Sequence, residues 1–144
     1  DIDIAREMAR ALGVKFVPLN TAWPSIIPAL NLGRFDIIIS GMSVTEERKL
    51  RVDFADSYMT IGQTILVNKK HKGVITSYEQ LNDPKYIVTS KPGTTGEEAV
   101  HKFIPKCTYK PFDTELEGAM EVIKGNADAF VYDLPYNVVF MAMC

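Results

Sequence analysis

The sequence predicts an α/β fold with two β/α lobes, and three observations support this. Apolar segments with a helical period alternate along the chain with short apolar segments typical of strands. Glycines follow several predicted helices, where helices commonly end. The alternating series occurs on both sides of a polar stretch at residues 69–73. This order favours parallel strands joined by right-handed crossovers, with helices against each sheet.

The first series lies within residues 1–67, which we expect to form the first lobe. Its opening segment carries apolar residues on one helical face, and Gly13 follows where that helix is expected to end. The expected elements are a helix at residues 1–12, a strand at 14–19, a helix at 24–32 and a buried strand at 35–39. Because a helix comes first, we expect a further strand upstream.

The second series lies within residues 68–144, the expected second lobe. Before it, residues 60–67 suit either a strand or an extended connection between lobes, and a hinge is expected near residues 66–70. The expected elements are strands at 86–89, 108–112 and 127–132, and helices at 95–104, at 115–124 and from about Pro135 onward. Thr94 and Glu97 fit a capping box at the start of the first of these helices.

Composition and charge argue against several classes of function. With 144 residues, 47% of them hydrophobic, the chain is long enough for one ordinary core or two small ones. A formal net charge of −2 offers no basic face to a phosphate backbone, so no nucleic-acid partner is expected. No apolar run approaches the roughly 18 residues that cross a bilayer, and no secretion signal opens the chain. We therefore expect a mature or trimmed product without direct membrane insertion.

Cysteine and histidine usage favours neither a metal nor a cofactor. Cys107 and Cys144 lack the spacing of a redox pair, and they either form one disulfide in an oxidising compartment or are ordinary buried residues. His71 and His101 have no histidine partner four residues away and no nearby cysteine pair. Both are therefore expected at the surface rather than as zinc ligands.

Candidate functional residues follow the predicted strands, because open α/β sheets bind ligands beyond the carboxyl ends of their strands. After residues 35–39 comes a turn that carries Ser43, and Arg48 follows it. Arg48 is either a solvated helix residue or a guanidinium fork that binds a carboxylate. In the second case, hydroxyl and amide donors at Ser43 would complete the shell around the anion.

The second lobe offers the complementary groups. Thr94 and Thr95 open a helix, where they are either a simple cap or part of an anion site at the positive end of the helix dipole. Asp133 follows a strand and either caps the next helix or pairs with an ammonium group. Trp23 is either a core residue or a flat apolar wall against a ligand side chain. Together these groups match a zwitterionic α-amino acid.

The same stretches resemble a known family, the polar amino-acid binding proteins of bacterial ABC importers, also called family 3 solute-binding proteins. The resemblance covers nearly the whole chain. The similar stretches are residues 1–5, residues 26–36, Gly41 to Arg48 with the following Val52-Asp53-Phe54, Gly93-Thr94-Thr95-Gly96-Glu97, and Asp128-Ala129-Phe130 through Asp133. The Thr-Glu-Glu-Arg stretch that ends at Arg48 and the Gly-Thr-Thr-Gly stretch at residues 93–96 are strong as a pair.

The resemblance implies a fold and a set of roles. The fold would be the type II periplasmic-binding-protein fold, in which two lobes close on a ligand about a hinge. Residues matching Ser43 and Arg48 hold the ligand α-carboxylate with help from the one matching Thr95, and the one matching Asp133 holds the α-ammonium. The position of Gly41 contributes a backbone contact, and that of Trp23 packs on the ligand side chain.

The resemblance also implies partners and a location. We expect the protein to bind a free amino acid, without chemistry, and to deliver it to the membrane permease of an ABC importer. A periplasmic or extracellular location follows, with lipoprotein anchoring as a variant. Family members have a first strand before the position of Asp1 and return segments after that of Cys144, so we expect a chain that is partial in both lobes.

Two other functions share the family architecture. A cyclohexadienyl-dehydratase-like enzyme needs a general acid or base in the cleft, and Glu97 and Asp133 are the candidates. Both residues also have non-catalytic explanations, at a helix terminus and as an ammonium ligand. The ligand-sensing domain of a receptor would share every binding residue and differ only in flanking membrane segments.

Overall fold

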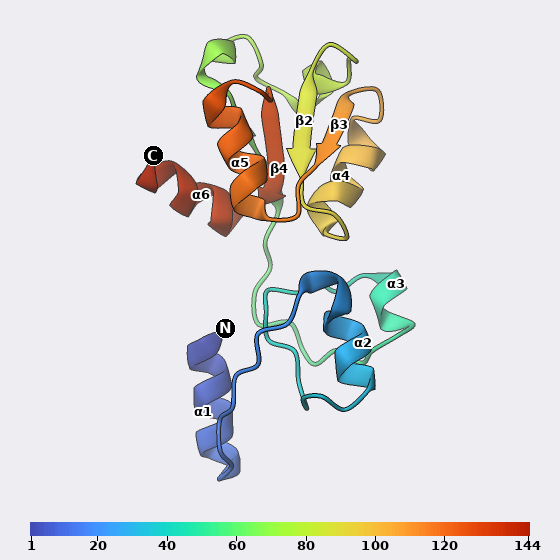
Figure 1. The fold of residues 1–144 in the computed structure, drawn as a ribbon, viewed down its shortest axis with the longest axis vertical. Helices are drawn as coiled ribbons and strands as arrows, with labels where there is room; N and C mark the ends of the chain where they lie inside the picture. Colours follow the sequence, from blue (N-terminus) through green and yellow to red (C-terminus); the bar gives the residue numbers. More distant parts are fainter. The chain divides into compact units, whose positions relative to one another are not determined.

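The computed structural model describes residues 1–144, which divide into two compact units, residues 1–58 (unit 1) and residues 59–144 (unit 2) (Figure 1). This division precedes the boundary expected after residue 67. The reason lies in the segment Gln63–Val67, which forms strand β1 and pairs with a strand of unit 2. Its backbone hydrogen bonds therefore make it part of the sheet of unit 2 rather than a connection.

Unit 1 contains helices and no β-strand. Its elements are α1 (Ile2–Leu12), a 3₁₀ helix at Trp23–Ser25, α2 (Ile26–Asn31) and α3 (Glu46–Lys49). The first predicted helix is confirmed, and its end at Gly13 has a left-handed φ of 67° with the Gly13 amide bonded to carbonyls of the last turn. The strands predicted at residues 14–19 and 35–39 are not formed. Neither segment has a backbone ladder with another strand, which is what defines a strand.

Unit 2 is built on a four-stranded sheet with the order β1-β4-β2-β3. Its strands are β1 (Gln63–Val67), β2 (Ile87–Ser90), β3 (Thr108–Pro111) and β4 (Ala129–Asp133). Strands β2, β3 and β4 are parallel, whereas the edge strand β1 runs antiparallel to β4. The three parallel strands agree with the predicted β/α series within one to two residues at most ends.

Helices cover both faces of this sheet (Figure 1). They are α4 (Thr95–Phe103), α5 (Glu115–Lys124) and α6 (Leu134–Met143). One buried cluster lies on the α4 face and contains Leu81, Val88, Val100, Ile104, Ala129 and Val131. The other lies against α5 and α6 and contains Ala119, Val122, Ala127, Phe130 and Phe140. Successive residues of β4 therefore serve opposite faces, as the pleat requires.

The helix termini of unit 2 are capped by threonine hydroxyls. At α5 the capping box is complete, because Thr114 and Glu117 each accept from the backbone amide of the other. At α4 the predicted box is only half formed. Thr94 Oγ1 accepts from the Glu97 amide at 3.5 Å, but Glu97 Oε2 accepts from the Gly93 amide at 2.7 Å instead of from the Thr94 amide.

The predicted cysteine and histidine sites behave as ordinary side chains. Cys107 and Cys144 are free thiols. His71 was expected at the surface, but its side chain is only 18% exposed, because it packs beside Tyr86 and lies 2.7 Å from the Asp128 carboxylate. His101 is exposed beside Tyr109, as expected. No group of three or more His, Cys, Asp or Glu side chains is placed to hold a metal ion. None of the helices has the length and apolar character needed to cross a bilayer.

Candidate functional site

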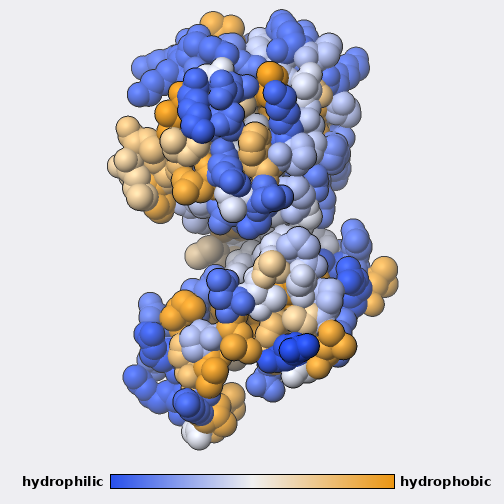
Figure 2. All heavy atoms as spheres, viewed as in Figure 1, coloured by the Kyte–Doolittle hydropathy of each residue, from blue (hydrophilic) through white to orange (hydrophobic).

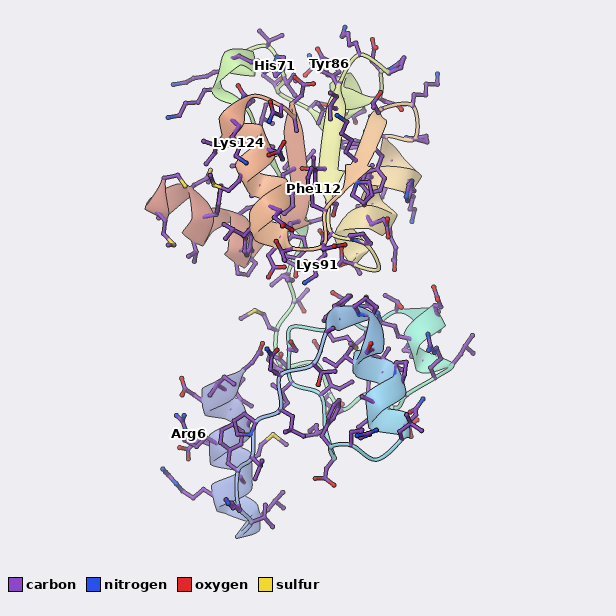
Figure 3. The ribbon with its side chains drawn as sticks, viewed as in Figure 1. Arg6, His71, Tyr86, Lys91, Phe112 and Lys124 are labelled. Carbon is purple, nitrogen blue, oxygen red and sulfur yellow. The ribbon has the colours of Figure 1, made fainter.

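In unit 2 the predicted site residues lie together at the end of the sheet where the parallel strands have their carboxyl ends. The parallel strands β2 and β4 both end there, β2 leading through Lys91 into the loop before α4, and β4 ending at Asp133. Figure 3 shows Lys91 at this end, and His71 and Tyr86 at the opposite end of the sheet. The antiparallel strand β1 begins at this same end of the sheet, because Gln63 pairs with Asp133. The carboxyl-end placement of Thr95 and Asp133 thus follows from the sheet topology.

Gln63 connects Thr95 and Asp133, the two residues of unit 2 predicted to bind the charged groups of the ligand. Its Nε2 donates to Thr95 Oγ1 at 3.0 Å and to Asp133 Oδ1 at 2.5 Å. Its Oε1 is buried and has no hydrogen-bond partner. Gln63 is not among the residues predicted from the sequence, since nothing in the local sequence marks it. The signal that finds it is the antiparallel register of β1 with β4, which no pattern within residues 60–67 specifies.

Asp133 presents a carboxylate that is not consumed by capping. It occupies the N-cap position of α6 but makes no side-chain capping bond, so the simple capping interpretation does not hold. The residue is half-buried, accepts from Gln63 through Oδ1, and takes part in no ion pair within the chain. Its remaining oxygen lone pairs suit a cationic donor, because a half-buried carboxylate gains most from a charged partner.

Thr94 and Thr95 have different tasks at the start of α4. The buried Thr94 hydroxyl donates to the Lys91 carbonyl at 2.7 Å and accepts from Glu97, so its role is to shape the loop. The half-buried Thr95 hydroxyl accepts from Gln63 and retains its own hydrogen to donate. The first-turn amides of α4 and its dipole add positive potential at this point.

Gly96 allows the start of α4 to approach the strand ends closely. A Cβ atom at this position would lie 2.7 Å from Ser90 Oγ and 2.7 Å from the Val131 carbonyl oxygen. Any larger residue would push α4 away from β2 and β4, and with it Thr95 from Gln63. Close packing therefore explains why the last residue of the Gly-Thr-Thr-Gly stretch, Gly96, is a glycine.

Lys91, in the loop before α4, forms an ion pair with Glu115. Lys91 Nζ lies 2.9 Å from Glu115 Oε2 at the start of α5. Burial acts to raise the pKa of Glu115, but the hydrogen bond and charge of Lys91 outweigh it, so the pKa is lowered. The pair holds the loop against α5, and Lys91 does not supply an uncompensated charge to the site.

In unit 1 the predicted residues Trp23, Ser43 and Arg48 come together. Arg48 is only 9% exposed, which overturns the interpretation of a solvated helix residue. Its guanidinium donates to the Ser43 carbonyl oxygen at 2.8 Å and lies 5.5 Å from the centroid of the Trp23 ring. Thr45 Oγ1 caps α3 by accepting from the Arg48 amide. Trp23 therefore has a defined partner and is not simply a core residue.

Gly41 lies beside a different group. Its φ of 57° is left-handed, which favours glycine, and a Cβ atom there would lie 4.0 Å from Asp1 Oδ2. The Asp1 carboxylate in turn accepts from the Tyr58 hydroxyl at 2.7 Å. No hydrogen bond or ring contact of the structure joins Gly41 to Arg48, Ser43 or Trp23.

A cavity of about 380 Å³ also lies in unit 2, on the α4 side of the sheet. Gln63 is the only site residue in its lining, which is otherwise Ile65, Tyr78, Ala99, Val100, Phe103, Ile104 and Val131. It contains no charged side chain, so it cannot recognise a zwitterion. The Thr95 hydroxyl and the Asp133 carboxylate, at the carboxyl ends of the parallel strands, are the better candidate site.

A comparison with known families places the chain. Residues 1–132 match the family described as bacterial extracellular solute-binding proteins, family 3. The chain belongs to this family. Family 3 membership confirms the resemblance found in the sequence.

The chain is similar to several named proteins and solved structures. The glutamine-binding protein of Geobacillus stearothermophilus is 35% identical over 92% of this chain and 51% of its own length. The crystal structure of the ancestral amino acid-binding protein AncCDT-1, a precursor of cyclohexadienyl dehydratase, is 47% identical with a TM-score of 0.95, covering 97% of this chain and 62% of that one. A binding component of an ABC transporter from Wolinella succinogenes, complexed with lysine, is 44% identical with a TM-score of 0.94, covering 98% and 60%.

The chain spans about half the length of the curated relatives it matches. The likeness to the solved structures extends over almost all of its residues. It is α/β with a mixed sheet, in agreement with the fold of amino-acid binding proteins.

Proposed function

We propose that this chain binds the backbone of a free amino acid and performs no chemistry on it. The observation that carries the proposal is the double hydrogen bond of Gln63, which holds the Thr95 hydroxyl beside the Asp133 carboxylate. A donor for an anion and an acceptor for a cation are thereby kept adjacent, as an α-carboxylate and an α-ammonium require. We assign Arg48 of unit 1, with Ser43, to bind the ligand α-carboxylate.

The burial of Arg48 supports this assignment. Arg48 is buried, and the Trp23 ring and the Ser43 carbonyl hold its guanidinium in one orientation. A rigid fork loses little conformational entropy when a carboxylate binds it. Trp23, flat and half-exposed, is assigned to pack on the ligand side chain, and Gly41 to make a backbone contact.

The relatives support the class of ligand and the wider role. They include proteins named for binding glutamine and amino acids, and one solved in complex with lysine. We assign to this chain an amino-acid ligand, closure of its two units about their connection, delivery to the permease of an ABC importer, and a periplasmic or extracellular location. These assignments rest on the family and on the site residues together.

A thermal-shift screen against the common L-amino acids tests the proposal, because ligands that bind only the folded state raise the melting temperature. We expect at least one strong response, and L-glutamine and L-lysine are the first probes. Calorimetric titration then compares Arg48→Ala and Asp133→Ala with the wild type. Both variants are expected to lose binding while remaining folded, whereas the exposed-site controls Arg10→Ala and Asp113→Ala are expected to bind normally. Wild-type affinity in either site variant would refute the assignment.

A dehydratase of the same architecture is the second candidate, and one solved relative is described as a precursor of cyclohexadienyl dehydratase. Such an enzyme needs an acid or base aimed at its substrate. Both Glu97 oxygens are already engaged, by the Gly93 amide and the Tyr109 hydroxyl, and Asp133 is engaged by Gln63. We therefore expect no product when the chain is incubated with prephenate. Product formation that Asp133→Ala or Glu97→Gln abolishes would favour the enzyme.

A further inference from the structure

The loop before α4 is held by a carboxylate that folds back onto it. Glu97, in the first turn of α4, accepts from the Gly93 amide through Oε2 at 2.7 Å. Gly93 has a left-handed φ of 70°, so the chain turns sharply at this point, directly before Thr94 and Thr95. The bond between Glu97 and Gly93 closes that turn, and it explains why the capping box at α4 is only half formed.

The second oxygen of Glu97 is fixed from the sheet. The Tyr109 hydroxyl, on β3, donates to Glu97 Oε1 at 3.0 Å. Tyr109 is half-buried and packs against the cluster that contains Val88 and Val100. The His101 ring meets the Tyr109 ring edge-on with centroids 5.0 Å apart, and His101 Nε2 lies 3.9 Å from Glu97 Oε1. The donor is therefore itself immobilised by packing.

The tyrosine remains a donor at neutral pH. Burial raises the pKa of the Tyr109 hydroxyl well above its ordinary value, and the negative charge of Glu97 raises it further. The hydroxyl thus stays protonated, and its hydrogen is directed to the carboxylate. The result is a chain of contacts from the core through Tyr109 and Glu97 to the Gly93 amide.

We infer that Tyr109 and Glu97 are positioning residues for ligand binding, which brace the turn at Gly93 so that Thr95 and the first-turn amides of α4 meet the ligand carboxylate in a fixed geometry. This inference rests on the proposed function. Neither side chain is assigned a ligand contact. Their effect comes from reducing the freedom of a glycine-containing turn, which would otherwise be ordered at the expense of affinity when the ligand binds.

The test combines affinity with a signal from the turn itself. Tyr109→Phe removes one hydrogen bond without changing the shape of the side chain, and we expect the Kd for the amino acid with the strongest response among L-glutamine and L-lysine to rise about fivefold. Glu97→Ala removes both bonds, and a rise of about tenfold or more is expected. Because Tyr109 acts only through Glu97, adding Tyr109→Phe to Glu97→Ala should cause no further loss.

The amide resonance of Gly93 in a ¹H–¹⁵N spectrum provides the second readout. A short bond to a carboxylate moves an amide proton downfield, so this resonance should move upfield in Glu97→Ala and shift in Tyr109→Phe, both without ligand. Glu97→Gln keeps an acceptor for the amide and should restore part of the affinity and of the shift. Tyr86→Phe is the matched control, since Tyr86 precedes β2 at the opposite end of the sheet, and it should change neither readout.

The outcomes separate the inference from the proposed function. A wild type that binds none of the amino acids would overturn both. Wild-type binding with unchanged affinity in Tyr109→Phe and Glu97→Ala would overturn the brace alone. An unchanged Gly93 resonance in Glu97→Ala would also overturn it, as would additive losses in the double variant.

Discussion

The two units respond differently to the same kind of sequence pattern. Unit 2 pairs its strands into a mixed sheet and buries two apolar clusters, one on each face. In unit 1 the buried apolar side chains are only Ala9 and Ile27, and its two predicted strands remain unpaired. Alternating β/α periodicity is therefore sufficient for a closed core only where each strand has a hydrogen-bonded neighbour.

The surface of the units reflects this difference. Unit 1 exposes large apolar side chains along α1 and the segments that follow it, including Leu12, Val14, Val17 and Leu19. Unit 2 exposes a group of them on α6, at Val138, Val139, Met141 and Met143. Figure 2 shows apolar residues at the surface in this part of the molecule. Eleven of the thirteen buried apolar residues belong to unit 2, so we expect most of the stability to reside there.

Hydrogen exchange should show the largest contrast. Backbone amides of β2 and β4 are paired inside a sheet covered on both faces, so they should exchange only through global opening of unit 2. Amides at residues 15–19 and 35–39 have no backbone hydrogen bond and should exchange nearly at the rate of a free peptide. We expect protection factors to differ by more than about a thousandfold. Comparable protection in the two regions, measured by NMR or mass spectrometry, would show that unit 1 has a core of its own.

Truncation of one core residue in each unit should show the second largest contrast. Phe130 is fully buried and packs in the α5 and α6 cluster, so Phe130→Ala should lower the free energy of unfolding by about 3–5 kcal/mol. Ile27→Ala in unit 1 should cost only about 1–2 kcal/mol, because few other buried side chains surround it. Urea denaturation followed by circular dichroism measures both. Equal losses would contradict the unequal cores.

Steric fit at the site edge gives a sharper test within unit 2. Gly96→Ala places a Cβ atom 2.7 Å from Ser90 Oγ and from the Val131 carbonyl oxygen, so it should destabilise the unit by about 1–3 kcal/mol and weaken ligand binding. Gly62→Ala is the control, since a Cβ atom at Gly62 has no heavy atom within 4 Å. Its melting temperature should match the wild type. A normal melting temperature in Gly96→Ala would show that α4 can move away from the strands without cost.

The polar group at the opposite end of the sheet should have the smallest effect. Asp128 accepts from His71, from the Ile87 amide and from Lys70 at 2.7, 2.8 and 2.8 Å. Burial acts to raise the pKa of Asp128, but these donors outweigh it and lower the pKa. Asp128→Asn should therefore reduce stability by about 1–2 kcal/mol at neutral pH.

The pH dependence of this effect has a definite sign. A carboxylate with a lowered folded-state pKa stabilises the fold above its unfolded-state pKa, near 4, and loses that contribution as pH falls through the folded-state pKa. The difference between wild type and Asp128→Asn should thus be present at neutral pH and shrink below about pH 4. Asp113→Asn, at an exposed position, should show no such dependence. A difference that persists at low pH would mean that Asp128 acts through shape and not through charge.

Local patterns were sufficient for most of unit 2. The helix at Glu115–Lys124 has the predicted ends, because Thr114 and Gly125 are unambiguous start and stop signals. The strand ends were predicted within one or two residues, since alternating burial and flanking turns mark them. Asp133 and Thr95 could be proposed as site residues because the carboxyl ends of parallel strands are predictable positions for function.

Long-range contacts were beyond local patterns. The pairing of β1 with β4 decides the boundary between the units and brings Gln63 to the site, yet residues 60–67 suit a connection equally well. The burial of Arg48 depends on Trp23 and Ser43, and its charged neighbours Glu46 and Lys49 instead suggest a solvated surface. Gln63 is placed by a strand remote in sequence, and Arg48 by a remote ring and a backbone carbonyl. Contacts of these kinds leave no periodic signal in the sequence.

The antiparallel edge strand β1 carries one more consequence. Because neighbouring side chains of a strand point to opposite faces, sliding β1 by a single residue would turn Gln63 away from Thr95 and Asp133. Edge strands are the ones most prone to such slippage. Asn137 of α6 opposes it by donating to Thr64 Oγ1 at 2.9 Å, and the Leu134 amide does so by bonding the Gly62 carbonyl at 3.1 Å. Correct alignment of one peripheral strand, secured by the helix that follows Asp133, thus decides whether Gln63 can bond Thr95 and Asp133.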